Sequence, residues 1–147
     1  MSEWRRDGFV VTDDHDRVDT DVVHDYLSNE SYWALHRSRA DTEAANAASW
    51  CFSVIDEATG AQVGFARLVT DRVTYGWLAD VFIVPSAQGH GLGTFLVGCI
   101  AEAAAGINRL HLGTRDAHGL YAKVGFTPLS YPDRAMERLL HPLAPDL

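Results

Sequence analysis

The segment that most restricts the fold is an apolar run that ends at a proline and leads into a loop with three glycines. The run TYGWLADVFIVP (residues 74–85) has the near-continuous apolarity of a buried central strand, and Pro85 ends it because proline cannot donate to a sheet ladder. After the glycines of QGHGLG (88–93), apolar residues recur with the spacing of one helix face, at positions 92, 95, 96, 99, 100 and 103. The sequence therefore predicts a strand, a glycine turn and a helix in direct succession.

Shorter patterns on both sides of this unit predict a sheet covered by helices. Strands are expected at residues 8–13, 50–56, 61–71, 109–114 and 126–131, with a hairpin turn at EATG (57–60). Helices are expected up to residue 27, up to residue 48 and over 116–125, with N-caps at Asp19 or Thr20, at Asp41 or Thr42, and at Asp116. This order indicates an α+β or α/β sheet with helices on both faces.

Length and charge narrow the classes of function. A chain of 147 residues fits a single domain, 1–147, and its net charge of −8 argues against nucleic acid as a partner, because phosphate binding needs a basic surface. No apolar run approaches the roughly 20 residues of a membrane span, and the N-terminus lacks a signal-peptide run. Cys51 and Cys99 have no paired spacing, which suits a reducing compartment. We therefore expect a cytoplasmic protein with no membrane partner.

Acidic residues are concentrated in the segment TDDHDRVDTDVVHD (residues 12–25). Such a segment is typical of helix N-termini and a solvated surface. A second interpretation is a negative field that attracts a cationic substrate.

The glycine loop fits neither of two familiar phosphate-binding motifs. A Walker loop needs a lysine after its last glycine, but Thr94 follows Gly93. A dinucleotide fingerprint that begins at Gly89 would need a third glycine at the position of Thr94. A glycine turn that enters a helix still presents backbone N–H groups and the positive end of the helix dipole to an anion. The alternative is a tight turn without a ligand.

Two motifs in order make the sequence resemble the GNAT superfamily of acyl-coenzyme A-dependent N-acetyltransferases. Gln88, Gly91 and Gly93 give the spacing Q-x-x-G-x-G of the coenzyme A loop, and GLYAKVGF (119–126) resembles a later L-Y-x-x-x-G-F segment. The resemblance covers about residues 63–129. It implies a mixed, mostly antiparallel sheet with a splayed central strand pair and helices on both faces. It also implies acetyl-CoA as co-substrate.

The resemblance assigns roles to particular residues. The backbone of Val81, Phe82 and Ile83 would pair with the pantetheine arm, and the Val81 amide would point at the thioester carbonyl. The pyrophosphate would lie on the loop that contains Gln88, Gly89, His90, Gly91, Leu92, Gly93 and Thr94. Tyr121 would lie near the sulfur as general acid, and the alternative is an aromatic core residue on an amphipathic helix.

The general base is not fixed by the sequence. Asp80 is the only charge within residues 75–84, so an ionised carboxylate there must be hydrogen-bonded or functional. It is a candidate structural carboxylate first and a candidate general base second. His118 and Asp116 border the segment that carries Tyr121, although Asp116 is also the expected helix cap. His111 is expected to be structural.

Two features depart from the family pattern. Many members have an asparagine seven residues before the tyrosine, whereas here Asp116 lies five residues before Tyr121. The basic residue that is usual inside the glycine loop is replaced by His90. These departures put a pantetheine contact and a side-chain charge on the pyrophosphate in question, and they leave the backbone amides of the loop unaffected.

The leading interpretation is an N-acetyltransferase that moves acetyl from acetyl-CoA to a primary amine by direct attack. The alternative is a non-catalytic acyl-CoA-binding sensor or interaction module on the same fold. The acceptor is a small molecule or a peptide amine, and Trp33, Trp50 and Trp77 line its pocket or fill core. No HExxH or CxxC motif is present, so we expect no metal. Homodimers are common among similar proteins, and nothing in the sequence indicates one.

Overall fold

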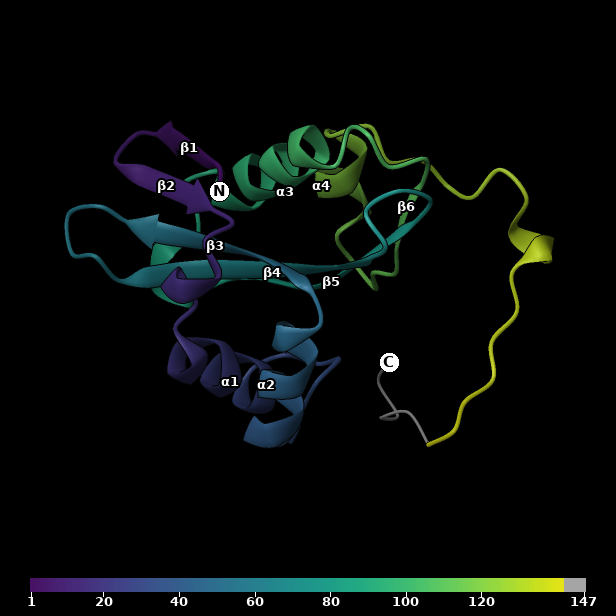
Figure 1. Ribbon diagram of the computed structural model, residues 1–147, viewed down its shortest axis with the longest axis horizontal. Helices are drawn as coiled ribbons and strands as arrows, with labels where there is room; N and C mark the ends of the chain where they lie inside the picture. The colour runs from purple at the N-terminus through teal and green to yellow at the C-terminus, as the bar shows by residue number, and fades with distance from the viewer. Residues whose placement is uncertain (142–147) are drawn as a thin grey trace.

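A six-stranded sheet forms the centre of the molecule in the computed structural model, which describes residues 1–141 (Figure 1). The strands lie side by side in chain order, and all neighbours are antiparallel except the parallel pair β5–β6. They are β1 (Glu3–Arg6), β2 (Phe9–Thr12), β3 (Trp50–Asp56), β4 (Gln62–Thr70), β5 (Gly76–Ile83) and β6 (Leu110–Leu112). The sheet is therefore mixed and mostly antiparallel, as predicted.

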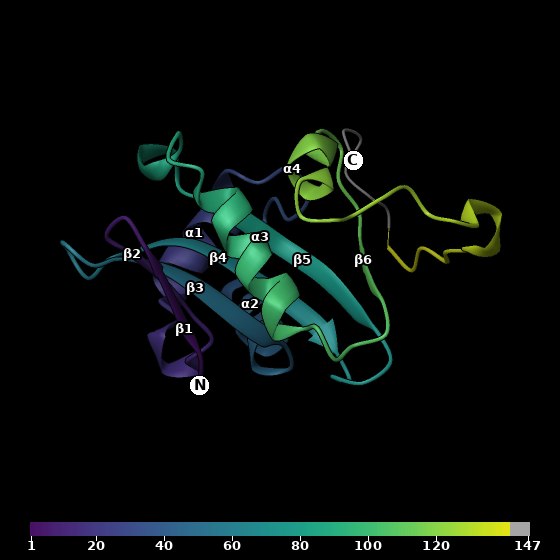
Figure 2. The same ribbon diagram turned by 90° about the horizontal axis from the view of Figure 1, so that it is seen from above.

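Helices cover both faces of this sheet. α1 (Thr20–Asn29) and α2 (Arg39–Ala47) lie on one face, and α3 (Leu92–Ala103) and α4 (His118–Ala122) lie on the other (Figures 1 and 2). Short 3-10 turns, η1 (His15–Arg17), η2 (Pro85–Ala87) and η3 (Pro132–Arg134), complete the described elements. The three-layer α+β architecture is confirmed.

Two apolar clusters pack the helices against the two faces of the sheet. The larger one packs α3 against the sheet through fully buried side chains such as Phe52, Leu68 and Leu96. The smaller one packs α1 on the opposite face, through Leu27 and Phe65 among others. Complete burial of one such side chain contributes about 1.5–3 kcal/mol, so both helix layers are held mainly by packing.

Strand β5 is irregular at the position of Asp80. Its pairing with β4 shifts there, because Arg67 lies opposite Ala79 whereas Phe65 lies opposite Phe82. Asp80 has a φ of +55°, in the left-handed region that side chains other than glycine, asparagine and aspartate seldom adopt. This β-bulge bends β5 away from a regular ladder.

Strands β5 and β6 separate after three residue pairs. Their register runs from Gly76 opposite Leu110 to Leu78 opposite Leu112, and no further pair follows. Beyond Leu78, β5 keeps β4 as its neighbour and has no partner strand on its other side among the described residues. The predicted splayed strand pair is thus β5 and β6.

Helix caps agree with the sequence at one position and differ at two. Asp19 caps α1 by accepting hydrogen bonds from the backbone of Asp21 and Val22. Ser38 caps α2, so the prediction of Asp41 or Thr42 was wrong; Thr42 is instead fully buried. Asp116 does not cap α4. Thr114 Oγ1 accepts from the Ala117 amide at the start of this helix, at 3.1 Å.

The strand expected at 126–131 is absent. Residues 127–131 are exposed and consist of bends and irregular backbone, and Pro128 lacks the N–H that a ladder would need. Conversely, the sequence did not predict β1, because EWRR has three charged residues and no apolar alternation. Within residues 1–141, no helix has the length and apolarity needed to cross a membrane.

Candidate active site

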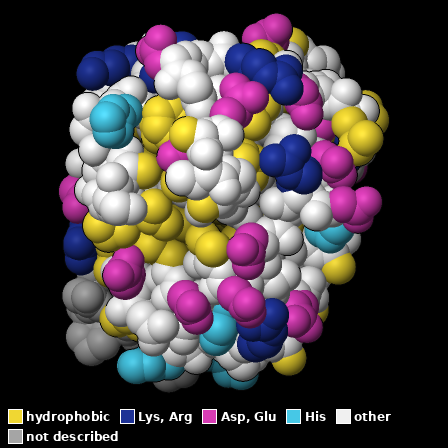
Figure 3. Space-filling model, turned by 90° about the vertical axis from the view of Figure 1, so that its left-hand side faces the viewer, with side chains coloured by type: hydrophobic (Ala, Val, Ile, Leu, Met, Phe, Trp, Pro, Cys, Tyr) yellow, Lys and Arg dark blue, Asp and Glu magenta, His cyan; other side chains and the backbone are white. Residues whose placement is uncertain are grey.

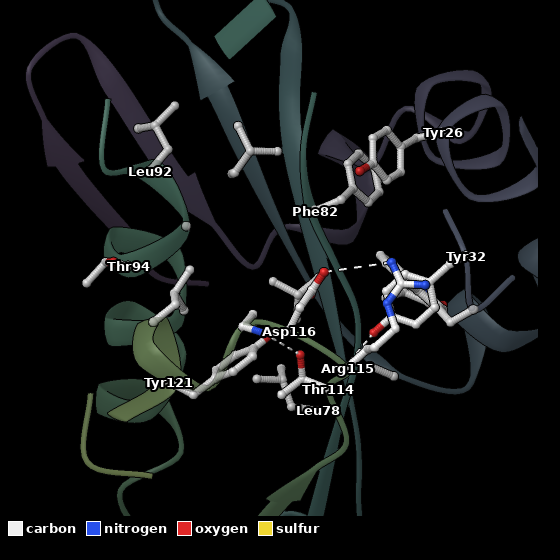
Figure 4. A pocket seen from close by; sticks show the side chains of 18 of the residues that line it. Tyr26, Tyr32, Leu78, Phe82, Leu92, Thr94, Thr114, Arg115, Asp116 and Tyr121 are labelled. Atoms are coloured by element: carbon white, nitrogen blue, oxygen red, sulfur yellow. Dashed lines mark hydrogen bonds and ion pairs between the residues drawn. The ribbon is translucent and has the colours of Figure 1, made fainter. Parts of the chain in front are cut away.

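A cavity of about 1000 Å³ opens where β5 and β6 separate (Figure 4). Its floor is β5 from Leu78 to Ile83, and one wall is the glycine loop with the start of α3. The opposite wall is the turn between β6 and α4, which carries residues 113–117, and Tyr121 projects into the cavity from α4. Aromatic side chains from α1, the α1–α2 loop and β5 line the remaining side, namely Tyr26, Tyr32, Trp33 and Trp77.

The open edge of β5 presents backbone groups to this cavity. The Val84 amide donates to Val63 of β4, so strand alternation turns the peptide groups of Ile83 and Val81 to the unpaired side. The Gln88 side chain donates to the Ile83 carbonyl at 3.0 Å, which marks the end of the free edge. An extended amide-containing chain could therefore pair with β5 here as an additional strand.

The glycine loop leaves the N-terminus of α3 open. Gly89 and Gly91 have φ values of +89° and +69°, which other residues adopt only with strain. Gly91 is the N-cap residue, and none of the described side chains caps the helix. The first amides of the 12-residue helix are thus available to an anion, with the helix dipole adding to the attraction.

An arginine from the far end of the chain supports this loop. Arg6 Nη2 donates to the carbonyls of Gly91 at 3.0 Å and His90 at 3.3 Å, and its guanidinium lies 4.6 Å from the centre of the Phe95 ring. Binding the carbonyls holds the loop with its amides turned to the other side. No local sequence pattern predicts this contact, because Arg6 lies more than 80 residues from the loop.

Tyr121 is held by the tight end of its short helix. Its carbonyl accepts from the Phe126 amide at 3.1 Å, Gly125 closes the turn with a φ of +93°, and the ring packs edge-on against Phe126. Burial raises the pKa of Tyr121 to about 12, with a smaller contribution from Tyr32. The hydroxyl therefore stays protonated throughout the neutral pH range.

Asp80 is bonded to three donors that come from other segments. Trp33 Nε1 donates to Oδ1 at 2.8 Å, while Arg37 Nη1 and Arg67 Nε donate to Oδ2 at 2.7 and 2.6 Å. Burial raises the pKa of the carboxyl, but the hydrogen bonds and charges of the two arginines outweigh it and hold the pKa below its usual value. A carboxylate so fully engaged is a poor proton acceptor, and this argues against Asp80 as the general base.

Two loops meet across the cavity. The Tyr32 hydroxyl accepts from the Arg115 amide at 3.0 Å, and the Arg115 guanidinium lies 4.0 Å from the centre of the Tyr32 ring (Figure 4). Arg115 also forms an ion pair with Asp116 at 3.7 Å. The α1–α2 loop is therefore tied both to the β6–α4 turn and, through Asp80, to the floor.

The other sequence candidates lie apart from the cavity. Trp50 donates to Asp13 and contacts Phe52, so of the three tryptophans only Trp33 and Trp77 line the cavity. His118 is exposed on α4, and His111 contacts the hydroxyl of Tyr75 at 3.1 Å.

The acidic segment 12–25 does not line the cavity either. Asp14 and Asp19 cap η1 and α1. Acidic side chains are spread over the whole face in Figure 3, including its lower part, on the side of the sheet that α1 and α2 cover. No group of three metal-ligating side chains lies together within residues 1–141.

Residues 48–128 match the profile of the acetyltransferase (GNAT) domain, which spans β3 to the end of the α4 turn. The chain belongs to the GNAT acetyltransferase family. Over 140 aligned residues it is 31% identical to a candidate acetyltransferase of Gibberella zeae, covering 82% of this chain and 79% of that protein. The family relationship identifies the protein as an acyltransferase.

Solved structures give the same assignment. A candidate GNAT acetyltransferase of Xanthomonas campestris pv. campestris superposes with a TM-score of 0.83 at 36% identity, covering 90% of this chain and 93% of that one. A protein of Staphylococcus aureus described as a probable acetyltransferase superposes with a TM-score of 0.68 at 20% identity, over 90% and 99% of the two chains. The latter likeness shows the GNAT fold alone.

The cavity brings together nearly all the residues that the motifs singled out. The β5 residues, the glycine loop and Tyr121 line one continuous space, although they come from positions 80 to 121. His90 is the exception, since it is exposed and its ring packs toward Phe9 with a centroid distance of 6.0 Å. The arginines were missed, because no local pattern links Arg37 and Arg67 to Asp80.

Proposed function

We propose that this GNAT enzyme transfers the acetyl group of acetyl-CoA directly to an amine bound in the same cavity. The observation that carries the proposal is the unpaired edge of β5, which lies between an open helix N-terminus and the partly buried side chain of Tyr121. The family uses acetyl-CoA as co-substrate. The cavity offers a separate group of this chain to each part of that molecule.

The donor is held largely by backbone. Val81 and Ile83 would pair with the amides of the pantetheine arm, and the amides of residues 89–94 would receive the pyrophosphate. Each hydrogen bond to a charged oxygen contributes about 1.5–3 kcal/mol, and the α3 dipole adds roughly 0.3–1 kcal/mol. Arg6 holds the loop in this arrangement.

The transfer needs no covalent enzyme intermediate. The neutral amine attacks the thioester carbonyl carbon, the C–N bond forms, and the C–S bond breaks with release of coenzyme A. The Val81 amide stabilises the oxygen that becomes negative, as an oxyanion-hole donor does. Placing both substrates in one cavity supplies the orientation on which such a step depends.

Tyr121 stabilises the leaving thiolate as a hydrogen-bond donor. With its pKa raised to about 12, complete proton transfer to a thiolate of pKa about 8.5 is uphill by about 5 kcal/mol. A charge-assisted hydrogen bond from the neutral hydroxyl is accordingly the favoured interaction, and the thiolate takes its proton from water as coenzyme A leaves.

Water accepts the proton that the acceptor amine must lose. An alkylammonium has a pKa of about 10.4, so supplying it neutral at pH 7 costs about 4.6 kcal/mol. Asp80 is committed to its arginines, and Tyr121 holds its own proton at this pH. We therefore expect the rate to rise with pH as the fraction of neutral amine rises.

An amine panel tests the proposal. Release of coenzyme A is measured with acetyl-CoA and each amine, for the wild type and for Tyr121→Phe, and binding of acetyl-CoA is measured separately by calorimetry. Turnover with at least one amine supports the proposal. Tight binding of acetyl-CoA without turnover on any amine would instead favour the alternative, a non-catalytic acyl-CoA sensor.

A further inference from the structure

The side of the cavity next to the β5 bulge carries more positive charge than the protein neutralises. Arg37 and Arg67 both line the cavity, and within residues 1–141 Asp80 is the one carboxylate that forms an ion pair with either of them. The side chains of Arg37, Arg67 and Asp80 are 22%, 15% and 1% exposed. Two guanidinium groups and one carboxylate leave a net charge of +1 in a largely buried position.

These arginines also keep unused donors. Arg37 binds Asp80 through Nη1, while its Nε and Nη2 make no hydrogen bond to residues 1–141. Arg67 binds Asp80 through Nε and Ser49 through Nη1, at 2.6 and 3.3 Å. A guanidinium carries five N–H donors in a rigid fork that matches an oxyanion. The α1–α2 loop thus brings Arg37 to the cavity with much of its donor capacity free.

An uncompensated charge in a partly buried cavity favours a ligand of opposite charge. Attraction between such groups is stronger there than in bulk water, because the protein lowers the effective dielectric constant. The acidic segment 12–25 suggested a cationic acceptor, but that segment lies outside the cavity. A cationic acceptor inside the cavity would be repelled by Arg37 and Arg67.

We propose that the amine acceptor carries a carboxylate, and that Arg37 and Arg67 bind this carboxylate while the amine faces the thioester. The inference rests on the proposed acetyl transfer and names the class of its acceptor, an amino acid or a related amine with a free carboxyl group. The single excess charge of the three side chains matches a carboxylate better than a phosphate ester, which carries −1.5 to −2 at neutral pH.

Matched substrates provide the first test. The twenty amino acids are compared as acceptors with their carboxamides, with propylamine, with a diamine and with O-phosphoethanolamine, and each kcat/KM is divided by the fraction of neutral amine. The best amino acid should exceed its own carboxamide by about 10- to 100-fold, the range of one charge-assisted hydrogen bond. Equal values, or a preference for the diamine, would overturn the proposal. A preference for O-phosphoethanolamine would overturn the assignment to a carboxylate.

Variants of the two arginines locate the effect. Arg37→Gln should bring the carboxylate-to-carboxamide ratio to within about threefold of unity by raising KM for the carboxylate. Arg67→Gln removes the second proposed contact, which comes from β4, and should lower the same ratio. Arg39→Gln is the matched control, because Arg39 is exposed and pairs with Asp21 and Glu43 outside the cavity. A ratio that Arg37→Gln and Arg67→Gln leave unchanged would refute the assigned contacts.

Binding without turnover separates this inference from the proposed activity. N-acetyl amino acids and their amides are titrated against the wild-type protein in the presence of coenzyme A, with tryptophan fluorescence as readout, since Trp33 and Trp77 line the cavity. Tighter binding of the carboxylates supports the anion site even if no amine is acetylated. Indifference to the carboxylate in an active enzyme would remove this inference and leave the acetyltransferase proposal intact.

Discussion

Replacing Asp80 by asparagine separates its structural role from a role as proton acceptor. Asparagine has nearly the same shape as aspartate and also tolerates a positive φ. The substitution should therefore leave the backbone conformation of the bulge, with its φ of +55°, unchanged. What changes is the set of acceptors. Trp33, Arg37 and Arg67 would meet one acceptor oxygen and an NH₂ donor in place of two charged oxygens. The two arginines would also lose their shared counter-charge.

The expected loss of stability is about 3 kcal/mol. Breaking a buried ion pair by removing one partner costs about 3–5 kcal/mol, and the lower end applies because Arg37 and Arg67 can turn partly into the cavity. For a chain of this size, 1 kcal/mol shifts Tm by about 2–4 °C, so Asp80→Asn should lower Tm by about 6–12 °C at pH 7. Thermal unfolding followed by circular dichroism measures this difference, and Asp21→Asn, at an exposed ion pair, should leave Tm close to that of the wild type.

The pH dependence of this difference has a definite sign. The pKa of Asp80 is lower in the folded protein than in the unfolded chain, so its stabilisation is fully present above the unfolded value of about 3.9. It is lost as pH falls through the folded value. The Tm difference between wild type and Asp80→Asn should therefore be constant from pH 5 to 8 and shrink below about pH 4. An unchanged Tm together with a fall in kcat of about 100-fold or more would refute this reasoning and restore Asp80 as the base.

Three further changes test other parts of the site. Tyr121→Phe should lower kcat about 10- to 100-fold with little change in KM for acetyl-CoA, because it removes one charge-assisted hydrogen bond to the thiolate; a wild-type kcat would exclude Tyr121 from the reaction. Gly91→Ala places a Cβ at a φ of +69° and 3.3 Å from Arg6 Nη2, and should weaken acetyl-CoA binding measured by calorimetry by about fivefold, for a strain of about 1 kcal/mol; Gly106→Ala, outside the cavity, is its control. Burial raises the pKa of both Cys51 and Cys99 to about 11, so neither thiol should react with Ellman's reagent at pH 8 until the protein is unfolded, and rapid reaction of the native protein would contradict their burial.

The sequence predicted the features whose causes are local. Glycine at positions 89, 91 and 125 is needed for positive φ values, and apolar residues on one face of α3 are needed for its packing. Both requirements leave a pattern within a few residues of the chain. The strand, the glycine loop and the helix that line the cavity could accordingly be predicted from the sequence.

The sequence did not predict the exact helix caps or the side-chain contacts between distant segments. Asp41 and Asp116 have good capping chemistry, but Ser38 occupies the N-cap position of α2, and the N-cap position of α4 is taken by Ala117, whose side chain cannot cap. Asp80 could be recognised as a charge in an apolar run, yet its engagement depends on Trp33 and Arg37, more than 40 residues away. No local pattern contains that information.

Asp80 connects the α1–α2 loop to strand β5 at the floor of the cavity. Its side chain anchors the α1–α2 loop through Trp33 and Arg37, while the bulge it creates sets the direction of the next peptide group, that of Val81. A shift of the α1–α2 loop would therefore pull on the residue that precedes the Val81 amide. This coupling gives a physical reason for an aspartate, rather than a glycine, at a backbone position that glycine would occupy with less strain.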